Sequence, residues 1–142
     1  MLNTIPKLLR LAVRGKEHDS LWVGKQFYDL GAFHYKLLDD TYYVPPRSSL
    51  WLLNALNFGR HLKWVKDSWD CDDYASAFKV LMNLTLGVNA VGMVVGPDHT
   101  WNVVVTETGV VTYEPQTGEW VEATGRYSLP PATISILSLS IR

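Results

Sequence analysis

The sequence predicts an α+β protein in which N-terminal helices lead into a central helix that packs on an antiparallel sheet. Three observations predict this fold class. The N-terminal half reads as helices separated by turns, the apolar period changes from helix to strand after Gly87, and the apolar segments beyond that point are joined by short turn sequences. The 142 residues fit a single domain, 1–142, because no repeat, low-complexity tract or Gly/Ser linker divides them.

The first segment, residues 1–19, is predicted to form a short amphipathic helix. Basic residues interrupt its apolar run at Lys7, Arg10 and Arg14. The segment therefore lacks the continuous hydrophobic stretch that a signal peptide needs.

An extended segment and a second helix are predicted next. The chain from Tyr42 to Pro46 must be extended, because each of its two prolines excludes the helical conformation for the residue before it. Ser48 or Ser49 can then cap a helix over residues 50–56.

The sequence WDCDDYA opens the central helix. Asp70 is a good helix cap, and Asp72 and Asp73 fall in the first turn, where carboxylates complement the positive end of the helix dipole. Apolar residues then recur with helical spacing to about Leu84. Cys71 lies one turn before these residues on the same face, so its side chain is expected to point inward.

Three strand segments are predicted after this helix. Residues 88–95 read as a buried strand, and residues 99–105 and 110–114 read as a hairpin across Thr108-Gly109. The C-terminal residues 134–141 alternate in two phases, which predicts an edge strand with a bulge.

The composition excludes some classes of function. Hydrophobic residues make up 47% of the chain and the formal net charge is −1, which gives no basic footprint for nucleic acid or for an anionic membrane. No apolar segment approaches the roughly 20 residues that cross a bilayer. The single cysteine excludes an internal disulfide and favours a reducing compartment, so we expect a cytoplasmic protein of a bacterial or phage-infected cell. A secreted protein without disulfides fits the same observation.

The order of three chemically active residues suggests a thiol site. A cysteine at a helix start, a histidine at the start of one strand and a carboxylate on the next can act as nucleophile, base and orienter of the base. His99 lies 28 residues after Cys71 (99 − 71), and Glu114 lies 15 after His99 (114 − 99). A two-residue turn at Thr108-Gly109 would place His99 opposite Gly118, so bringing His99 to Glu114 is expected to need a longer loop or a bulge.

Each of these residues also has a structural interpretation. Cys71 fits a small core residue, and the three aspartates fit a cap and its charged first turn. Glu114 ends an apolar strand just before Pro115, where a salt bridge or a turn role is common.

Taken together, three short motifs resemble a known family. The sequences WDCDDYASAF, HTWN and YEPQTGEW follow one another with compatible gaps within residues 42–121. They resemble the calcium-dependent, papain-like cysteine protease domain at the C-terminus of the Marasmius oreades agglutinin, and small bacterial and phage proteins similar to it. The resemblance implies a papain-like or transglutaminase-like cysteine protease fold.

The resemblance also implies roles for individual residues. Cys71 would be the nucleophile, His99 the general base and Glu114 its orienter. The candidate calcium ligands are Asp70, Asp72, Asp73, Asn102 and Gln116. Calcium suits this all-oxygen ligand set, and a dication among the aspartates would offset the negative field around the thiol. Alternation along a regular strand places Asn102 and His99 on opposite faces, so a ligand role for Asn102 needs a twist there.

Three functions follow from this resemblance. The first is a calcium-dependent thiol hydrolase, most simply a cysteine peptidase that acts on a protein or peptide substrate. The second is a metal-stabilised binding or structural module that does not catalyse a reaction. If the chain is phage-encoded, this module would act on a host protein. The third is a deamidase or transglutaminase, which transfers acyl groups with the same three residues. Papain-like enzymes place a glutamine shortly before the cysteine, where this chain has residues 63–66, KWVK, and this departure favours the second function.

Overall fold

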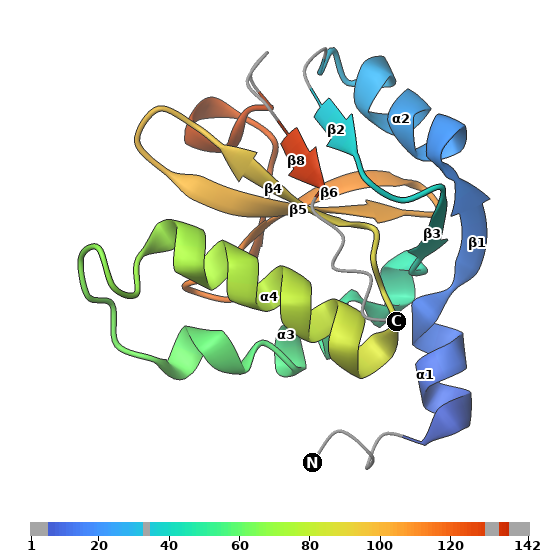
Figure 1. The fold of residues 1–142 in the computed structure, drawn as a ribbon, viewed down its shortest axis with the longest axis horizontal. Helices are drawn as coiled ribbons and strands as arrows, with labels where there is room; N and C mark the ends of the chain where they lie inside the picture. Colours follow the sequence, from blue (N-terminus) through green and yellow to red (C-terminus); the bar gives the residue numbers. More distant parts are fainter. Residues whose placement is uncertain (1–5, 33–34, 130–133, 137–142) are drawn as a thin grey trace.

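The computed structural model describes residues 6–32, 35–129 and 134–136 (Figure 1). The helices are α1 (Lys7–Arg14), α2 (Ser20–Asp29), α3 (Leu50–Ala55) and α4 (Cys71–Leu86), with short 3-10 turns η2 (Arg47–Ser49), η3 (Phe58–His61) and η4 (Gly125–Tyr127). The strands are β1 (Lys16–Asp19), β2 (Tyr35–Leu37), β3 (Thr41–Val44), β4 (Val91–Val95), β5 (Thr100–Thr106), β6 (Gly109–Glu114), β7 (Glu119–Val121) and β8 (Ile134–Ile136).

The main sheet has six strands in the order β2-β8-β4-β5-β6-β7. Its pairs are antiparallel except β2 with β8, which run parallel. A separate two-stranded sheet joins β1 to β3. The protein is therefore of mixed α/β composition, and its predicted papain-like or transglutaminase-like classification stays a prediction.

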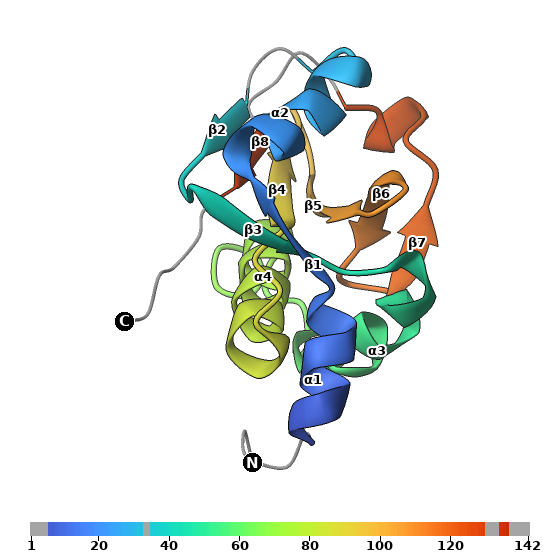
Figure 2. The same cartoon turned by 90° about the vertical axis from the view of Figure 1, so that its right-hand side faces the viewer.

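Two apolar clusters pack on the two faces of the main sheet. One cluster joins the sheet to α1, α3 and α4, and includes Leu53, Phe78 and Tyr113. The other joins the sheet to α2 and β3, and includes Phe27 and Trp101. In Figures 1 and 2, α4 lies below the sheet and α2 lies above it. Alternate residues of each central strand therefore face different helical layers, as the strand period requires.

The start and end of α4 follow from residues that the sequence marks. Asp70 is the N-cap, and its backbone N–H donates to Asp73 Oδ2 over 3.1 Å. Gly87 ends the helix at φ 71°, a left-handed conformation that glycine adopts without the steric penalty of a side chain. This helix places Cys71 as its first residue, at the end of the sheet where β5 begins.

The hairpin between β5 and β6 differs by one residue from the predicted turn. Thr106 pairs with Gly109, so Glu107 and Thr108 form the turn instead of Thr108 and Gly109. The shift changes every cross-strand partner by two residues. As a result, Glu114 lies diagonally opposite His99 without the longer loop or bulge that was expected.

Three other elements differ from the sequence-based expectations. The predicted edge strand was wrong for the part that the structure describes, because β8 lies between β2 and β4. The predicted bulge lies beyond residue 136, outside the described residues. The N-terminal half also contains β1 and β2, which the sequence did not indicate, because short strands of mixed polarity carry little periodic signal.

Candidate functional site

A groove of about 510 Å³ opens at the start of α4. The loop before α4, the beginning of β5, the residues after β6 and the η4 turn form its walls. The residues that line it are Trp64, Lys66, Asp67, Asp70, Cys71, Asp98, His99, Glu114, Gln116, Thr117, Arg126 and Tyr127. The structure thus brings together Cys71, His99 and Glu114, which are far apart in the sequence.

The most ordered part of the groove is the environment of Glu114. The His99 ring lies 2.6 Å from the carboxylate, Nε2 to Oε2, and both side chains are almost fully buried. Tyr127 donates its hydroxyl to the same oxygen over 3.0 Å, and the backbone N–H of Gln116 donates to Oε1 over 3.1 Å. Both carboxylate oxygens therefore have partners, and the His99 ring is held in one orientation.

Aromatic contacts fix the same histidine from two other sides. The Tyr127 ring meets His99 edge to face at 5.9 Å, and the Trp101 ring stacks on it at 6.0 Å. Burial and the hydrogen bond to Glu114 both raise the pKa of Tyr127, burial being the larger cause. Tyr127 consequently stays a neutral donor to Glu114 across the physiological range of pH.

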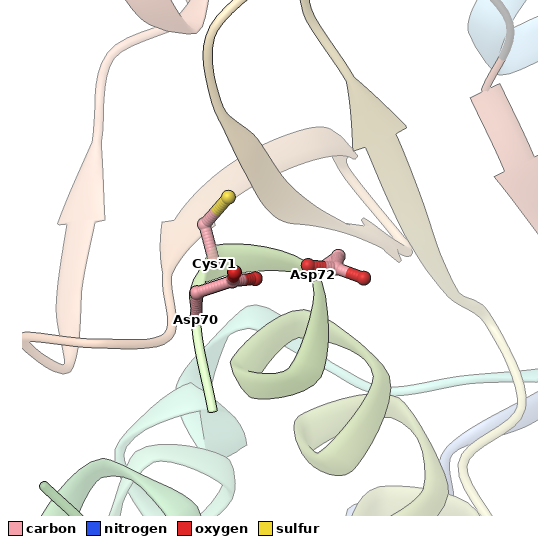
Figure 3. Close-up of side chains that lie close together, drawn as sticks. All are labelled: Asp70, Cys71 and Asp72. Atoms are coloured by element: carbon pink, nitrogen blue, oxygen red, sulfur yellow. The ribbon is translucent and has the colours of Figure 1, made fainter. Parts of the chain in front are cut away.

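Cys71 is half-buried and is the first residue of α4. Its side chain leaves the helix in a different direction from that of Asp72 (Figure 3). Cys71 and His99 line the same groove, but no hydrogen bond joins the thiol to the ring among the described residues. The predicted nucleophile and base are therefore neighbours across the groove, and their predicted roles stay predictions.

The predicted metal ligands fall into separate groups. Asp70, Cys71 and Asp72 each place one donor atom within 4.8 Å of the others. A hydrogen bond between the two carboxyl groups lowers the pKa of Asp70 and raises the pKa of Asp72, because one proton held between them favours one charged and one neutral partner. Asp73 instead caps α4 through the backbone N–H of Asp70.

The two amide residues of the predicted ligand set lie apart from each other. Asn102 is fully buried and donates to the carbonyl oxygens of Ala75 and Gly92, each over 3.0 Å, so that it ties α4 to β4. Its Oδ1 is buried with no hydrogen-bond partner among the described residues. Gln116 lines the groove beside Glu114. The ligand roles of both residues stay predictions.

Sequence reasoning missed several residues of the groove. Trp64 and Asp67 lie in the loop before α4 and Arg126 lies in the short η4 turn, where no periodic signal marks a functional side chain. Tyr127 lies beyond the motif-bearing segment 42–121 and reaches Glu114 only because the chain folds back after β7. No local sequence pattern could have indicated that contact.

No protein-family model and no curated protein sequence matches this chain. Solved structures do resemble it. A structure described as the PSL1a-E64 complex matches with a TM-score of 0.64 and 20% sequence identity, over 83% of this chain and 48% of that one. A structure of Polyporus squamosus lectin bound to the human-type influenza-binding epitope Neu5Aca2-6Galb1-4GlcNAc matches with a TM-score of 0.56 and 21% identity, over 74% of this chain and 45% of that one.

These likenesses correct the family and the activity that the motifs implied. The matched structures are described as a lectin and as a PSL1a complex, and neither description names a peptidase. The prediction of the agglutinin-type cysteine protease family was wrong, as were the thiol hydrolase and acyl-transferase functions and the protein or peptide substrate. The physical reason is that three short motifs describe where a few side chains lie, whereas function depends on what the surrounding site binds.

The chain spans about half the length of the structures that it matches, 48% and 45% of them. At 20% and 21% identity, the likeness establishes a shared fold. The chain therefore shares its fold with part of a lectin.

Proposed function

We propose that this chain is a binding protein, that its ligand site is the groove at the start of α4, and that its ligand is a glycan. The glycan class comes from the Polyporus squamosus lectin, whose bound ligand is a sialylated trisaccharide epitope. The groove is the observation of this chain that carries the proposal, because it combines aromatic rings with many polar groups in one concave surface.

The side chains of the groove suit a hydroxyl-rich ligand. Trp64 is 51% exposed and offers an aromatic face on which the C–H face of a sugar ring can pack. Asp67 and Asp98 supply acceptors for hydroxyl groups, while Lys66 and Arg126 supply donors. A sugar hydroxyl can both donate and accept a hydrogen bond, so a ligand rich in hydroxyl groups would pair with the acceptors and with the donors.

The buried side of the groove is preorganised. His99, Glu114 and Tyr127 are joined by hydrogen bonds of 2.6 and 3.0 Å. A site whose side chains are already ordered loses less conformational entropy on binding. The hydrogen bonds among His99, Glu114 and Tyr127 therefore favour ligand binding at this wall of the groove.

Calcium is a second component of the proposal. Asp70 and Asp72 provide hard oxygen donors close enough to share one cation. The buried, unpartnered Oδ1 of Asn102 adds a further amide oxygen near the same helix. Asp70 also lines the groove, so a cation held there would lie beside the ligand.

The proposed site can be tested by calorimetric titration with a panel of neutral and sialylated oligosaccharides. We expect a ligand whose affinity falls at least about tenfold in Trp64→Ala, since that change removes an aromatic face. Trp51→Ala is the matched control, because Trp51 is 65% exposed on α3 and does not line the groove. The control should bind like the wild-type chain.

Two results would contradict the proposed site. Equal loss of affinity in both tryptophan variants would place the ligand elsewhere, and no heat from any oligosaccharide at millimolar concentration would exclude a glycan. In that case E64, which is named in complex with PSL1a, is the next probe, and Cys71→Ala would show whether the groove binds it.

A further inference from the structure

Helix α1 exposes most of its apolar side chains. Val13 is its only buried residue, whereas Leu8 is 82% exposed, Leu11 45% and Leu9 40%. A helix that packs on a domain normally turns its apolar face toward the core. Here much of that face is turned to solvent.

The exposed leucines share one side of the helix. At about 100° per residue, Leu11, Leu8 and Leu9 follow one another around the helix axis, and Lys7 lies next to Leu11. Arg10 lies between Val13 and Arg14 around the axis, and its guanidinium group approaches Gly87 at the end of α4. Lys7 and Arg10 are both exposed. Residues 6–16 contain no acidic residue, and Lys16 adds a further exposed cation directly after the helix.

The rest of the protein fixes the orientation of this helix. Val13 joins the apolar cluster beneath the sheet, and the Arg14 guanidinium lies 3.9 Å from the centre of the Tyr43 ring. Arg14 also lies against Gly87 at the end of α4, where a cation complements the helix dipole. Figure 2 shows α1 at the lower end of the molecule, below β1 and beside α4. The leucine arc therefore points outward on a helix whose other side packs against the domain.

We infer that α1 docks on an anionic phospholipid surface. The leucines would enter the boundary between headgroups and acyl chains, and the exposed side chains of Lys7 and Lys16 would meet the lipid phosphates and carboxylates. The local excess of positive charge carries this choice of partner, since the chain as a whole has a net charge of −1. Among the described residues, no helix has the length and apolarity to cross a bilayer, so the contact is with the surface.

Sedimentation with vesicles tests the inference on the full chain. We expect the protein to pellet with vesicles of phosphatidylserine and phosphatidylcholine at low salt, and to remain in the supernatant with phosphatidylcholine alone. The double variant Leu8→Gln/Leu11→Gln should bind at least about tenfold more weakly, because the apolar contribution is lost. Lys7→Glu should weaken binding without changing the apolar surface.

Leu21→Gln is the matched control. Leu21 is also 82% exposed, but it lies on α2, whose cap is Asp19 and whose last residue is Asp29. This variant should sediment like the wild-type chain. Absence of binding to the anionic vesicles, or equal loss in the Leu21 control, would overturn the inference. A dimer by light scattering that Leu8→Gln/Leu11→Gln abolishes, with no vesicle binding, would assign the surface to a second copy instead.

Discussion

Glu114 is the residue on which the geometry of the groove depends. Its carboxylate accepts from Tyr127 and from the backbone of Gln116, and it holds the His99 ring at 2.6 Å. The sequence indicated that His99 and Glu114 would meet, because a hairpin joins them. It could not indicate Tyr127, since contacts between a loop and a distant strand depend on how the whole chain folds back.

At this scale we predict the effect of Tyr127→Phe. The change removes one hydrogen bond to a buried carboxylate, so the free energy of unfolding should fall by about 1–3 kcal/mol. The affinity for the groove ligand should fall as well, because His99 becomes less ordered. Chemical denaturation and calorimetry measure the two effects. An unchanged Tyr127 variant would show that the hydrogen bond contributes nothing.

At the scale of elements, the start of α4 was the most predictable feature. Asp70 and Gly87 bound the helix as the capping rules indicate. The hairpin was predicted one residue out of place, because Thr108-Gly109 resembles a turn although the chain turns at Glu107 and Thr108. Gly109 has a φ of 125°, a conformation that favours glycine, although it is the first residue after the turn. A glycine at this place therefore resembles a turn residue in the sequence.

The acidic start of α4 should respond to calcium. Calcium should raise the melting temperature by mass action, and a chelator should reverse the effect. The hydrogen bond with Asp70 raises the pKa of Asp72, and calcium binds the deprotonated carboxylate, so the response should fade as the pH falls toward and below that pKa. Thermal melts of Asp72→Asn should show a weaker calcium response than those of Asp29→Asn, a variant far from the cluster. Identical curves with calcium and with chelator in the wild-type chain would remove calcium from the proposal.

The contact between α3 and the sheet should make the fold sensitive to alkaline pH. Tyr113 donates to Asn54 Oδ1 over 2.5 Å and accepts from Asn57 Nδ2 over 3.0 Å, and burial raises its pKa from 10.0 to about 12. The stabilisation is complete below pH 10 and is lost as the pH rises through about 12, because the unfolded chain releases the proton first. We expect a loss on the order of 2 kcal/mol over this range.

Urea unfolding of Tyr113→Phe at several pH values checks this assignment. The variant should be about 1–2 kcal/mol less stable at neutral pH, because the buried amide of Asn57 and the half-buried amide of Asn54 each lose a partner. Its stability should then decline less steeply than that of the wild-type chain above pH 10. Parallel declines would mean that other groups cause the alkaline sensitivity.

At the scale of the whole molecule, the sequence indicated helices before a sheet and predicted that Cys71, His99 and Glu114 would lie together, and these three residues line one groove. It could not reveal that β8 inserts between β2 and β4, because strand order depends on long-range pairing. It also led to a peptidase, since three short motifs describe how Cys71, His99 and Glu114 are positioned and not what enters the groove between them. The lectin likeness changes that conclusion and leaves the positions of the residues unchanged.

The most direct test of the central claim compares the wild-type chain with Cys71→Ala in two assays run side by side, oligosaccharide binding and cleavage of an unfolded protein substrate, both with calcium. A binding protein needs no nucleophile, so the account predicts that the wild-type chain cleaves nothing and that Cys71→Ala keeps its oligosaccharide affinity to within about threefold. Cleavage by the wild-type chain that Cys71→Ala abolishes, with no oligosaccharide bound by either protein, would contradict the account and show that the groove is a catalytic site.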